Sequence, residues 1–332
     1  MKPIRLALMG AGIFARDAHL PSLRNLTEQF EVVAVYSRTE ATARSLATEI
    51  GTDPKIYTDL AALLLAPDVD AVDVVLPIPV MPPVVAQALA SGKHVISEKP
   101  LAPNVATCRQ LMASYQRERQ VWMVAENWRY ESAFVKAAEL VQSGAIGKPV
   151  TCQMALYLPM PTHSKYFQTA WRRTGEFFGG TLMDGGVHHI AALRLVVGEI
   201  AAVSAMTAHA STTFATDDSL SATLHFANGA IGSYLVTYAA GAPWPAYLCL
   251  VGDQGALRVQ RGEVELTQGN QTETIQCPKF DGVEKEFIAF AAAIREGQPH
   301  GNTPEQGIND VAVIEAMVRS AQSGCQTLVS TA

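Results

Sequence analysis

Short apolar runs alternate with longer amphipathic stretches through the first part of the chain. The apolar runs cover residues 4–9, 32–36, 71–76, 94–96 and 121–124, and the amphipathic stretches cover residues 21–28, 40–49, 82–91 and 106–119. Such alternation predicts βαβ units around a parallel sheet, with a nucleotide crevice at the carboxyl ends of the strands. We therefore expect a Rossmann domain over residues 1–124.

Strand-like runs dominate the second part of the chain. They cover residues 150–158, 201–210, 219–226, 230–238, 247–251 and 256–260. The turn pairs Asn228-Gly229 and Gly252-Asp253 separate several of them, and the first pair is a strong hairpin signal. Helical patterns over residues 284–295 and 303–323 close the chain. We expect a second domain over residues 125–332, of α+β type with a large and mostly antiparallel sheet, in a protein of the α/β class.

Composition and charge narrow the class of protein. A chain of 332 residues exceeds the size at which one hydrophobic core keeps growing, so two domains are expected. Its 48% hydrophobic and 17% charged residues are typical of a folded globular protein. The net charge of −6, without a basic tract, argues against a nucleic-acid or anionic-membrane partner. The expected partners are small molecules and further copies of the same chain.

The cysteines and the N-terminus bear on where the protein resides. The five cysteines are scattered and form no C-x-x-C pair, which is typical of reduced thiols in the cytoplasm and gives no zinc site. No apolar run reaches the ~18 residues of a membrane span. Lys2 and Arg5 precede an apolar run, as in a secretory signal peptide, but Gly10 and Gly12 interrupt that run. We interpret it as a buried strand and a glycine turn, and expect a cytoplasmic protein.

The glycine turn has the spacing Gly10-x-Gly12-x-x-Ala15. The first glycine permits the tight turn, the second lets a pyrophosphate approach the backbone, and the small Ala15 allows close packing of helix on strand. The alternative is a glycine turn without a ligand. Because the motif follows an apolar strand, opens a helix-like segment and precedes a second strand, nucleotide binding is favoured.

Ser37-Arg38-Thr39 follow the second strand, where an NAD-binding protein usually carries an acidic residue for the ribose hydroxyls. Two hydroxyls and a guanidinium suit the 2′-phosphate of NADP, which carries charge and accepts several hydrogen bonds. The sequence therefore favours NADP, with NAD as the alternative. In the alternative, Arg38 stacks on the adenine or points to solvent.

Asp184 and His188 are candidates for proton transfer. A carboxylate and an imidazole four residues apart fall on one face of a helical turn. With Lys99, which stands between Glu98 and Pro100 at a strand end, they can relay a proton. A metal site that uses His188 and His189 is the alternative, but only Asp184 lies at a familiar ligand spacing from the pair. We therefore predict no metal, and a packing role for His189.

Motifs along nearly the whole chain resemble those of the glucose-fructose oxidoreductase, inositol dehydrogenase and rhizopine-catabolism protein family. The resemblance rests on Gly10-x-Gly12-x-x-Ala15 followed by His19, residues 90–95 leading into Glu98-Lys99-Pro100, Asn127-x-Arg129-Tyr130, Gly144-x-Ile146-Gly147, Gly179-Gly180, Asp184-x-Gly186-x-His188, Asn228-Gly229 and Gly252-x-x-Gly255. It implies an NAD(P)-dependent oxidoreductase, commonly acting on a sugar or cyclitol. It also implies an open-faced sheet used for oligomerisation, and hence a homodimer or homotetramer.

The family's catalytic lysine, aspartate and histidine correspond to Lys99, Asp184 and His188. Imidazole ordinarily titrates nearest neutral pH, so His188 is our first choice for the base that removes the carbinol proton. Lys99 then holds the same oxygen, and Asp184 orients a hydroxyl or the histidine. The roles of Lys99 and His188 can also be exchanged, because a buried lysine can act as a base.

The predicted binding residues form two sets. The cofactor set is Gly10, Gly12, Ile13, Phe14, Ala15, Ser37, Arg38, Thr39, Leu76, Pro77, Glu98, Lys99 and Asn127. The substrate set is Lys99, Arg129, Tyr157, Trp171, Arg172, Asp184 and His188. Trp128 and Trp171 can line a sugar pocket or belong to the core. Arg172 and Arg173 suit an anionic or hydroxyl-rich ligand, or else form a surface ion pair with Glu176.

Two departures from the family pattern leave the substrate open. Residues 79–83 form a proline-rich, apolar loop where many members have Pro-Asn-x-x-His, and Ala191 replaces an aspartate that commonly follows the histidine. The alternative function is a nucleotide-loaded sensor or binding protein of the same fold, without turnover. The intact set of Lys99, Asp184 and His188 favours the enzyme.

Overall fold

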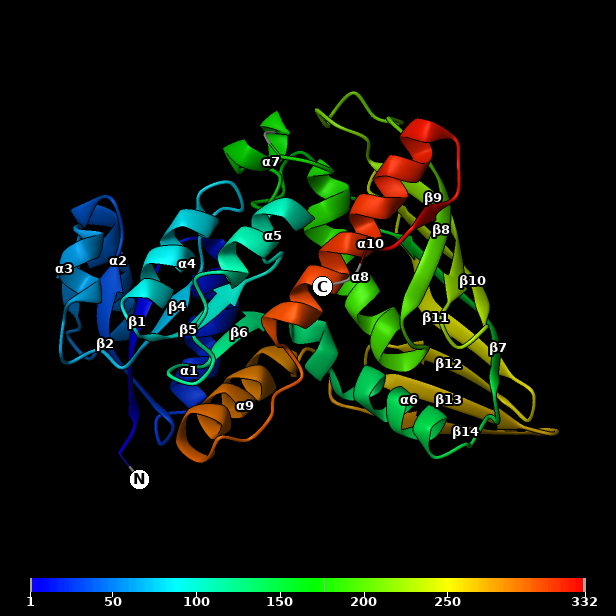
Figure 1. Ribbon diagram of the computed structural model, residues 1–332, viewed down its shortest axis with the longest axis horizontal. Helices are drawn as coiled ribbons and strands as arrows, with labels where there is room; N and C mark the ends of the chain where they lie inside the picture. The colour runs from blue at the N-terminus through cyan, green and yellow to red at the C-terminus, as the bar shows by residue number, and fades with distance from the viewer. Residues whose placement is uncertain (1, 176, 331–332) are drawn as a thin grey trace. The chain divides into compact units, whose positions relative to one another are not determined.

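The computed structural model describes residues 2–175 and 177–330 and divides the chain into two compact units (Figure 1). The first unit comprises Met1–Glu126 and Val283–Ile308, and the second comprises Asn127–Gly282 and Asn309–Ala332. Within the described ranges, no helix has the length and apolar character needed to cross a membrane.

The first unit is built on a six-stranded sheet with the order β3-β2-β1-β4-β5-β6. Its strands are β1 (Ile4–Met9), β2 (Phe30–Tyr36), β3 (Lys55–Tyr57), β4 (Ala71–Val74), β5 (His94–Glu98) and β6 (Trp122–Ala125). All neighbouring strands are parallel, which confirms the predicted Rossmann sheet. The central strands are mainly apolar because a parallel sheet is covered on both faces, and their polar residues include Asp73 of β4 and Glu98 of β5.

The helices of this unit begin and end close to the amphipathic stretches, with two differences, and one short helix over residues 60–64 was not predicted. They are a π-helical turn η1 (Ala15–His19), α1 (Leu20–Asn25), α2 (Glu40–Ile50), α3 (Leu60–Leu64), α4 (Met81–Ala90) and α5 (Val105–Met112). The first helical segment begins at Ala15, directly after the glycine turn, and not at residue 21. Helix α5 begins where the Asn104 side chain accepts a 2.9 Å bond from the Thr107 N–H, and it ends seven residues before the predicted end.

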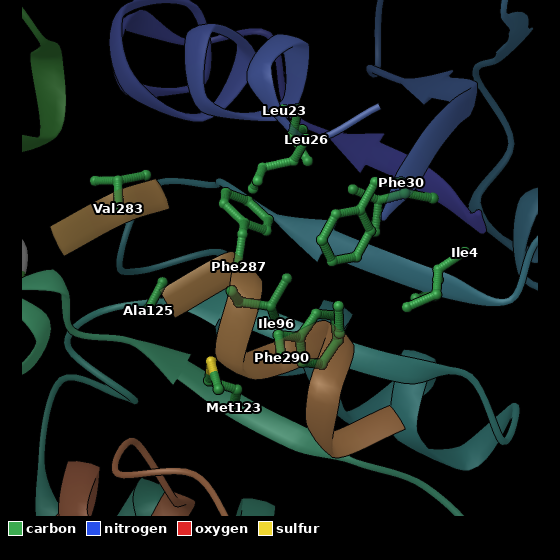
Figure 2. Packing of buried hydrophobic residues seen from close by; sticks show 13 residues of the cluster. Ile4, Leu23, Leu26, Phe30, Ile96, Met123, Ala125, Val283, Phe287 and Phe290 are labelled. Carbon is green, nitrogen blue, oxygen red and sulfur yellow. The ribbon is translucent and has the colours of Figure 1, made fainter. Parts of the chain in front are cut away.

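Residues 283–308 return to the first unit, whereas a continuous second domain over residues 125–332 was expected. They include most of helix α9 (Gly282–Glu296). Phe287 and Phe290 of α9 are fully buried in a cluster with Phe30 of β2 and Ile4 of β1, as Figure 2 shows. Burying two phenylalanines against the sheet is worth about 3–6 kcal/mol, which is enough to decide where the helix packs.

The second unit is built on a nine-stranded sheet with the order β14-β13-β12-β11-β7-β10-β9-β8-β15. Its strands are β7 (Pro149–Tyr157), β8 (Ile200–Ala208), β9 (Ser219–Phe226), β10 (Ile231–Thr237), β11 (Trp244–Gly252), β12 (Ala256–Gln260), β13 (Glu263–Gln268), β14 (Gln271–Gln276) and β15 (Thr327–Leu328). Among the described strands of this sheet, β7 and β10 are the one pair that runs parallel, so the mostly antiparallel sheet is confirmed.

The two faces of this sheet differ. Helices α6 (Ser132–Gln142), α8 (Gly180–Val196) and the part of α10 (Pro304–Ser323) from Asn309 onward lie on one side, as Figure 1 shows. Tyr234 of β10 is fully buried on that side. Ile231, three positions earlier on the same strand, is 55% exposed, and Met206 of β8 is 78% exposed. The alternation along the strands therefore separates a covered face from an open one. The turn η2 (Asn127–Tyr130) and the short helix α7 (Ala170–Thr174) complete the unit.

Candidate active site

The glycine turn connects β1 to the π-helical turn in the first unit. The N–H of Gly10 donates to the carbonyl of Tyr36 at 2.9 Å, and its φ of +107° belongs to the region that favours glycine. A Cβ at Gly10 would collide with the carbonyl oxygen of Val75. Gly12 is exposed, and a Cβ there would meet nothing within 4 Å. The turn is thus tightly packed at Gly10 and presents open backbone at Gly12, which fits the close approach of a pyrophosphate.

The other predicted cofactor residues of this unit follow the strands. Ile13 and Phe14 are half-buried, and the predicted small residue Ala15 is fully buried. The N–H of Ser37 donates to Tyr57 at 3.2 Å. Residues 76–77, after β4, are half-buried.

Arg38 and Thr39 after β2 are both exposed. The Thr39 hydroxyl donates to Thr42 at 2.6 Å. No hydrogen bond or ion pair to another described residue holds the guanidinium of Arg38. Arg38 therefore remains available to a ligand.

Glu98 and Lys99 stand at the carboxyl end of β5. The carboxylate of Glu98 is buried and lies 2.9 Å from Nε2 of His19, and its second oxygen accepts the backbone N–H of Lys99 at 3.2 Å. Lys99 is half-buried, and the peptide bond to Pro100 is cis. The structure thus ties the backbone of Lys99 to a fixed carboxylate.

Asp184 and His188 lie one turn apart on α8 in the second unit, as their spacing predicts. Asp184 is buried and forms an ion pair with Arg172, in which Nε of Arg172 donates a hydrogen bond to Oδ2 of Asp184 at 2.8 Å. The guanidinium of Arg172 lies 4.0 Å from the ring centre of Trp171 and 5.5 Å from that of Tyr166. Arg172 thus pairs with the predicted catalytic carboxylate. Glu176, the other suggested partner, lies outside the described residues.

His188 is half-buried and stacks on Trp128, with ring centres 5.7 Å apart and planes 16° from parallel. The guanidinium of Arg261 lies 4.4 Å from the ring centre of Trp128 and also pairs with Glu131 at 3.2 Å. Trp128 therefore supports the candidate base, and it also stacks on Phe134 in the protein interior.

Arg129, from the predicted substrate set, is buried and pairs with a carboxylate that is not among the predicted site residues. Its Nη2 lies 2.9 Å and 3.0 Å from the two oxygens of Asp310, which also pairs with Arg194 at 2.5 Å. His189 is buried, and its Nδ1 lies 2.7 Å from the hydroxyl of Tyr234.

Two predicted residues lie at the ends of elements in the second unit. Tyr157 is the last residue of β7 and is half-buried. Asn127, from the predicted cofactor set, begins η2.

Sequence reasoning assigned no role to His19 or Tyr238. Tyr238 is buried, and its hydroxyl has no hydrogen-bond partner among the described residues. That hydroxyl lies where a Cβ of Gly185 would stand, beside Asp184. Burial raises the pKa of Tyr238, and the charge of Asp184 raises it further, so the hydroxyl stays protonated. The bare Gly185 between Asp184 and His188 was the sequence signal for a close neighbour.

Metal-ligating groups do not gather in the described part of the chain. No set of three or more His, Cys, Asp or Glu side chains there has an arrangement that could hold a metal ion. Among the described residues, none of the five cysteines forms a disulfide: Cys108, Cys152, Cys249, Cys277 and Cys325.

Family models match both parts of the chain. Residues 4–126 match the NAD-binding Rossmann fold of the Gfo/Idh/MocA oxidoreductase family, and residues 138–328 match its C-terminal alpha/beta domain. Between them the two matches take in almost all of the sequence.

Individual oxidoreductases resemble this chain over nearly its whole length, in agreement with the family matches. An oxidoreductase from Thermotoga maritima is 38% identical, with a TM-score of 0.92 over 98% of both chains. A D-apiose dehydrogenase from Paraburkholderia graminis is 27% identical over 98% of this chain and 89% of its own length. A levoglucosan dehydrogenase in complex with NADH and L-sorbose, 22% identical over 100% of both chains, has the same fold with a TM-score of 0.89. The chain therefore belongs to the Gfo/Idh/MocA family of oxidoreductases.

Proposed function

We propose that this oxidoreductase is an NAD(P)-dependent dehydrogenase or reductase for the CH–OH or carbonyl carbon of a sugar, cyclitol or related polyhydroxylated molecule. The observation that carries the proposal is the Arg172-held carboxylate of Asp184 one helical turn from His188, in a chain that also has Lys99 at the end of β5. The sugar dehydrogenase among its relatives supports the substrate class.

The residues divide the proton chemistry among them. His188 accepts the proton of the carbinol hydroxyl, and the stack on Trp128 restricts the rotation of its ring. The ammonium of Lys99 holds the same oxygen and stabilises the charge that develops on it. Asp184, neutralised by Arg172, accepts a hydrogen bond from a neighbouring substrate hydroxyl. In the exchanged arrangement, Lys99 is the base and His188 the donor.

The glycine turn, Arg38 and the residues after β4 and β5 would hold the dinucleotide. When bound, the nicotinamide supplies the acceptor or donor of the hydride. We propose that NADP is preferred, because Arg38 is exposed and not engaged by another described side chain. A guanidinium in that position suits a 2′-phosphate better than a neutral ribose.

The open face of the nine-stranded sheet bears on assembly. It exposes Met206 and Ile231, each more than half accessible. An exposed apolar sheet face favours pairing with a second copy, so we propose a homodimer or homotetramer that covers it. The five cysteines form no disulfide among the described residues, which is consistent with the cytoplasmic location that we also propose.

The test is a substrate panel. Purified protein is mixed with NADP or NAD and a series of sugars, cyclitols and aldehydes, and the absorbance band of reduced nicotinamide is followed in single-turnover and steady-state experiments. We expect turnover with at least one polyhydroxylated substrate. Tight cofactor binding with no hydride transfer to or from any member of the panel would overturn the proposed enzymatic function. The nucleotide-loaded sensor would then be the remaining interpretation.

A further inference from the structure

His19 lies at the centre of a buried set of hydrogen bonds in the first unit. It is the last residue of the π-helical turn that follows the glycine turn, and it is fully buried. Its Nδ1 lies 2.8 Å from Oδ2 of Asp73 on β4, and its Nε2 lies 2.9 Å from Oε1 of Glu98 on β5. The imidazole therefore bridges two carboxylates on neighbouring strands.

The bridge continues to Lys99. Oε2 of Glu98, the oxygen that His19 does not contact, accepts the backbone N–H of Lys99 at 3.2 Å. Each oxygen of this carboxylate thus has a different partner, which fixes the orientation of the carboxylate and the direction in which the chain leaves β5. Lys99 is the first residue after that strand.

The surroundings keep the imidazole in place and protonated. Phe14 and Phe287 each meet the ring edge-on, with ring centres 5.3 Å away. Asp73 on β4 and Glu98 on β5 act electrostatically on His19, and Glu286 on α9 interacts with these three groups and with Glu126 after β6. Burial alone would lower the pKa of His19, but the charges and hydrogen bonds of Asp73 and Glu98 raise it well above its usual range.

We propose that His19 is a positioning residue for Lys99, acting through Glu98. This inference rests on the role of Lys99 in the proposed function. A protonated imidazole has two N–H donors on opposite sides of a rigid ring, so it donates to both carboxylates at once. A glutamine of similar length has one amide nitrogen, and its oxygen would face the second carboxylate. Removing the bridge therefore frees Glu98 to rotate and loosens the backbone of Lys99.

The first experiment compares His19→Gln with Phe290→Leu in the full-length protein. Phe290 is buried on α9 and stacks on Phe30, so its substitution controls for a loss of stability in the same unit. With the best substrate of the panel, we expect His19→Gln to lower kcat about 10- to 100-fold, because small displacements of a catalytic group have effects of this size. The KM for the cofactor should rise by less than ~3-fold, because His19→Gln keeps the side chain of Lys99 and leaves the backbone of the glycine turn untouched.

The result for Phe290→Leu decides between positioning and structure. We expect a lower melting temperature with a kcat near that of the wild type. Equal losses of kcat in the two variants at equal melting temperature would overturn the proposal. So would a His19→Gln variant whose only change is a higher KM for the cofactor.

A second measurement does not depend on activity. Amide hydrogen exchange is measured at single-residue resolution for Lys99 and for Ile96, which lies within β5 and is paired with β4 and β6. His19→Gln should speed exchange at Lys99 about 10-fold or more while leaving Ile96 unchanged, since only the first amide is held by Glu98. Exchange at Lys99 that is no faster than in Phe290→Leu would refute positioning. If the wild type turns over no substrate, the proposed function fails, and this measurement still decides the role of His19.

Discussion

The two sheets of this protein place their chemistry differently. In the parallel sheet of the first unit, the glycine turn, residues 37–39, residues 76–77 and Lys99 all follow the carboxyl ends of strands. In the second unit, Asp184 and His188 lie on helix α8, which covers one face of an antiparallel sheet. Parallel strands bring their carboxyl ends to one edge, so topology alone gathers those residues. In the second unit, side-chain contacts decide which groups meet.

Because the two units place their functional residues differently, we expect substitutions in them to have different effects. Changes at the strand ends should affect the cofactor, whereas changes on α8 should affect the substrate step. The open face of the second sheet should tolerate substitutions that the covered first sheet does not.

The largest effect is expected at the proton-transfer residues. His188→Ala and Lys99→Met should each lower kcat by about 10²–10⁴, because each removes an acid, base or charge-stabilising group. The cofactor dissociation constant should rise clearly in Lys99→Met and stay unchanged in His188→Ala. Steady-state kinetics and fluorescence titration with reduced cofactor measure both quantities. A weakened cofactor affinity in His188→Ala would contradict the assignment of cofactor binding to the first unit and of the substrate step to α8.

Core packing gives the next largest difference. Phe287→Ala, in the buried cluster of Figure 2, should lower the free energy of unfolding by about 3–5 kcal/mol. Ile231→Ala, on the open sheet face, should change it by less than ~0.5 kcal/mol in the monomer. Chemical denaturation checks both values. If Ile231→Ala proves strongly destabilising at high protein concentration only, a second copy covers that face.

A smaller effect is expected on the affinity for the cofactor when Arg38 is replaced. Arg38→Ala should weaken NADP binding by about 1.5–3 kcal/mol, the value of a charge-assisted hydrogen bond, and should leave NAD binding nearly unchanged. Calorimetric titration with each cofactor measures the two losses. Equal losses would show that Arg38 contacts a part common to both cofactors.

The buried cluster of His19, Asp73, Glu98 and Glu286 predicts that the stability of the folded protein depends on pH. The pKa of His19 is raised by its carboxylate partners despite burial, and burial raises the pKa values of Asp73 and Glu286. The folded protein therefore keeps these protons to higher pH than the unfolded chain does, so stability falls as pH rises. The contribution of His19 is complete below pH ~6.5 and is lost above it, at up to ~1.4 kcal/mol per pH unit.

Melting temperatures between pH 6 and 9 test this prediction. The wild type should lose stability over that range, and His19→Gln should lose less. A wild-type curve that rises with pH would contradict the protonated state of the cluster.

The fold was largely predictable, except where an amphipathic helix had to choose a partner. Alternating apolar and amphipathic stretches predicted the parallel sheet, and strand-like runs separated by turn pairs predicted the antiparallel one. The pattern of residues 284–295 predicted α9 but not that Phe287 and Phe290 pack on the first sheet. An apolar stripe specifies that a helix is covered, and not which surface covers it.

The sequence by itself determined which chemical groups are available: the glycine turn, Arg38, Lys99, Asp184 and His188, each recognisable from local spacing. Only the tertiary structure decided their partners. It paired Asp184 with Arg172, stacked His188 on Trp128 and linked Lys99 through Glu98 to His19. Local spacing follows from backbone geometry over a few residues, whereas these contacts join distant segments and exist only once burial has fixed both sides.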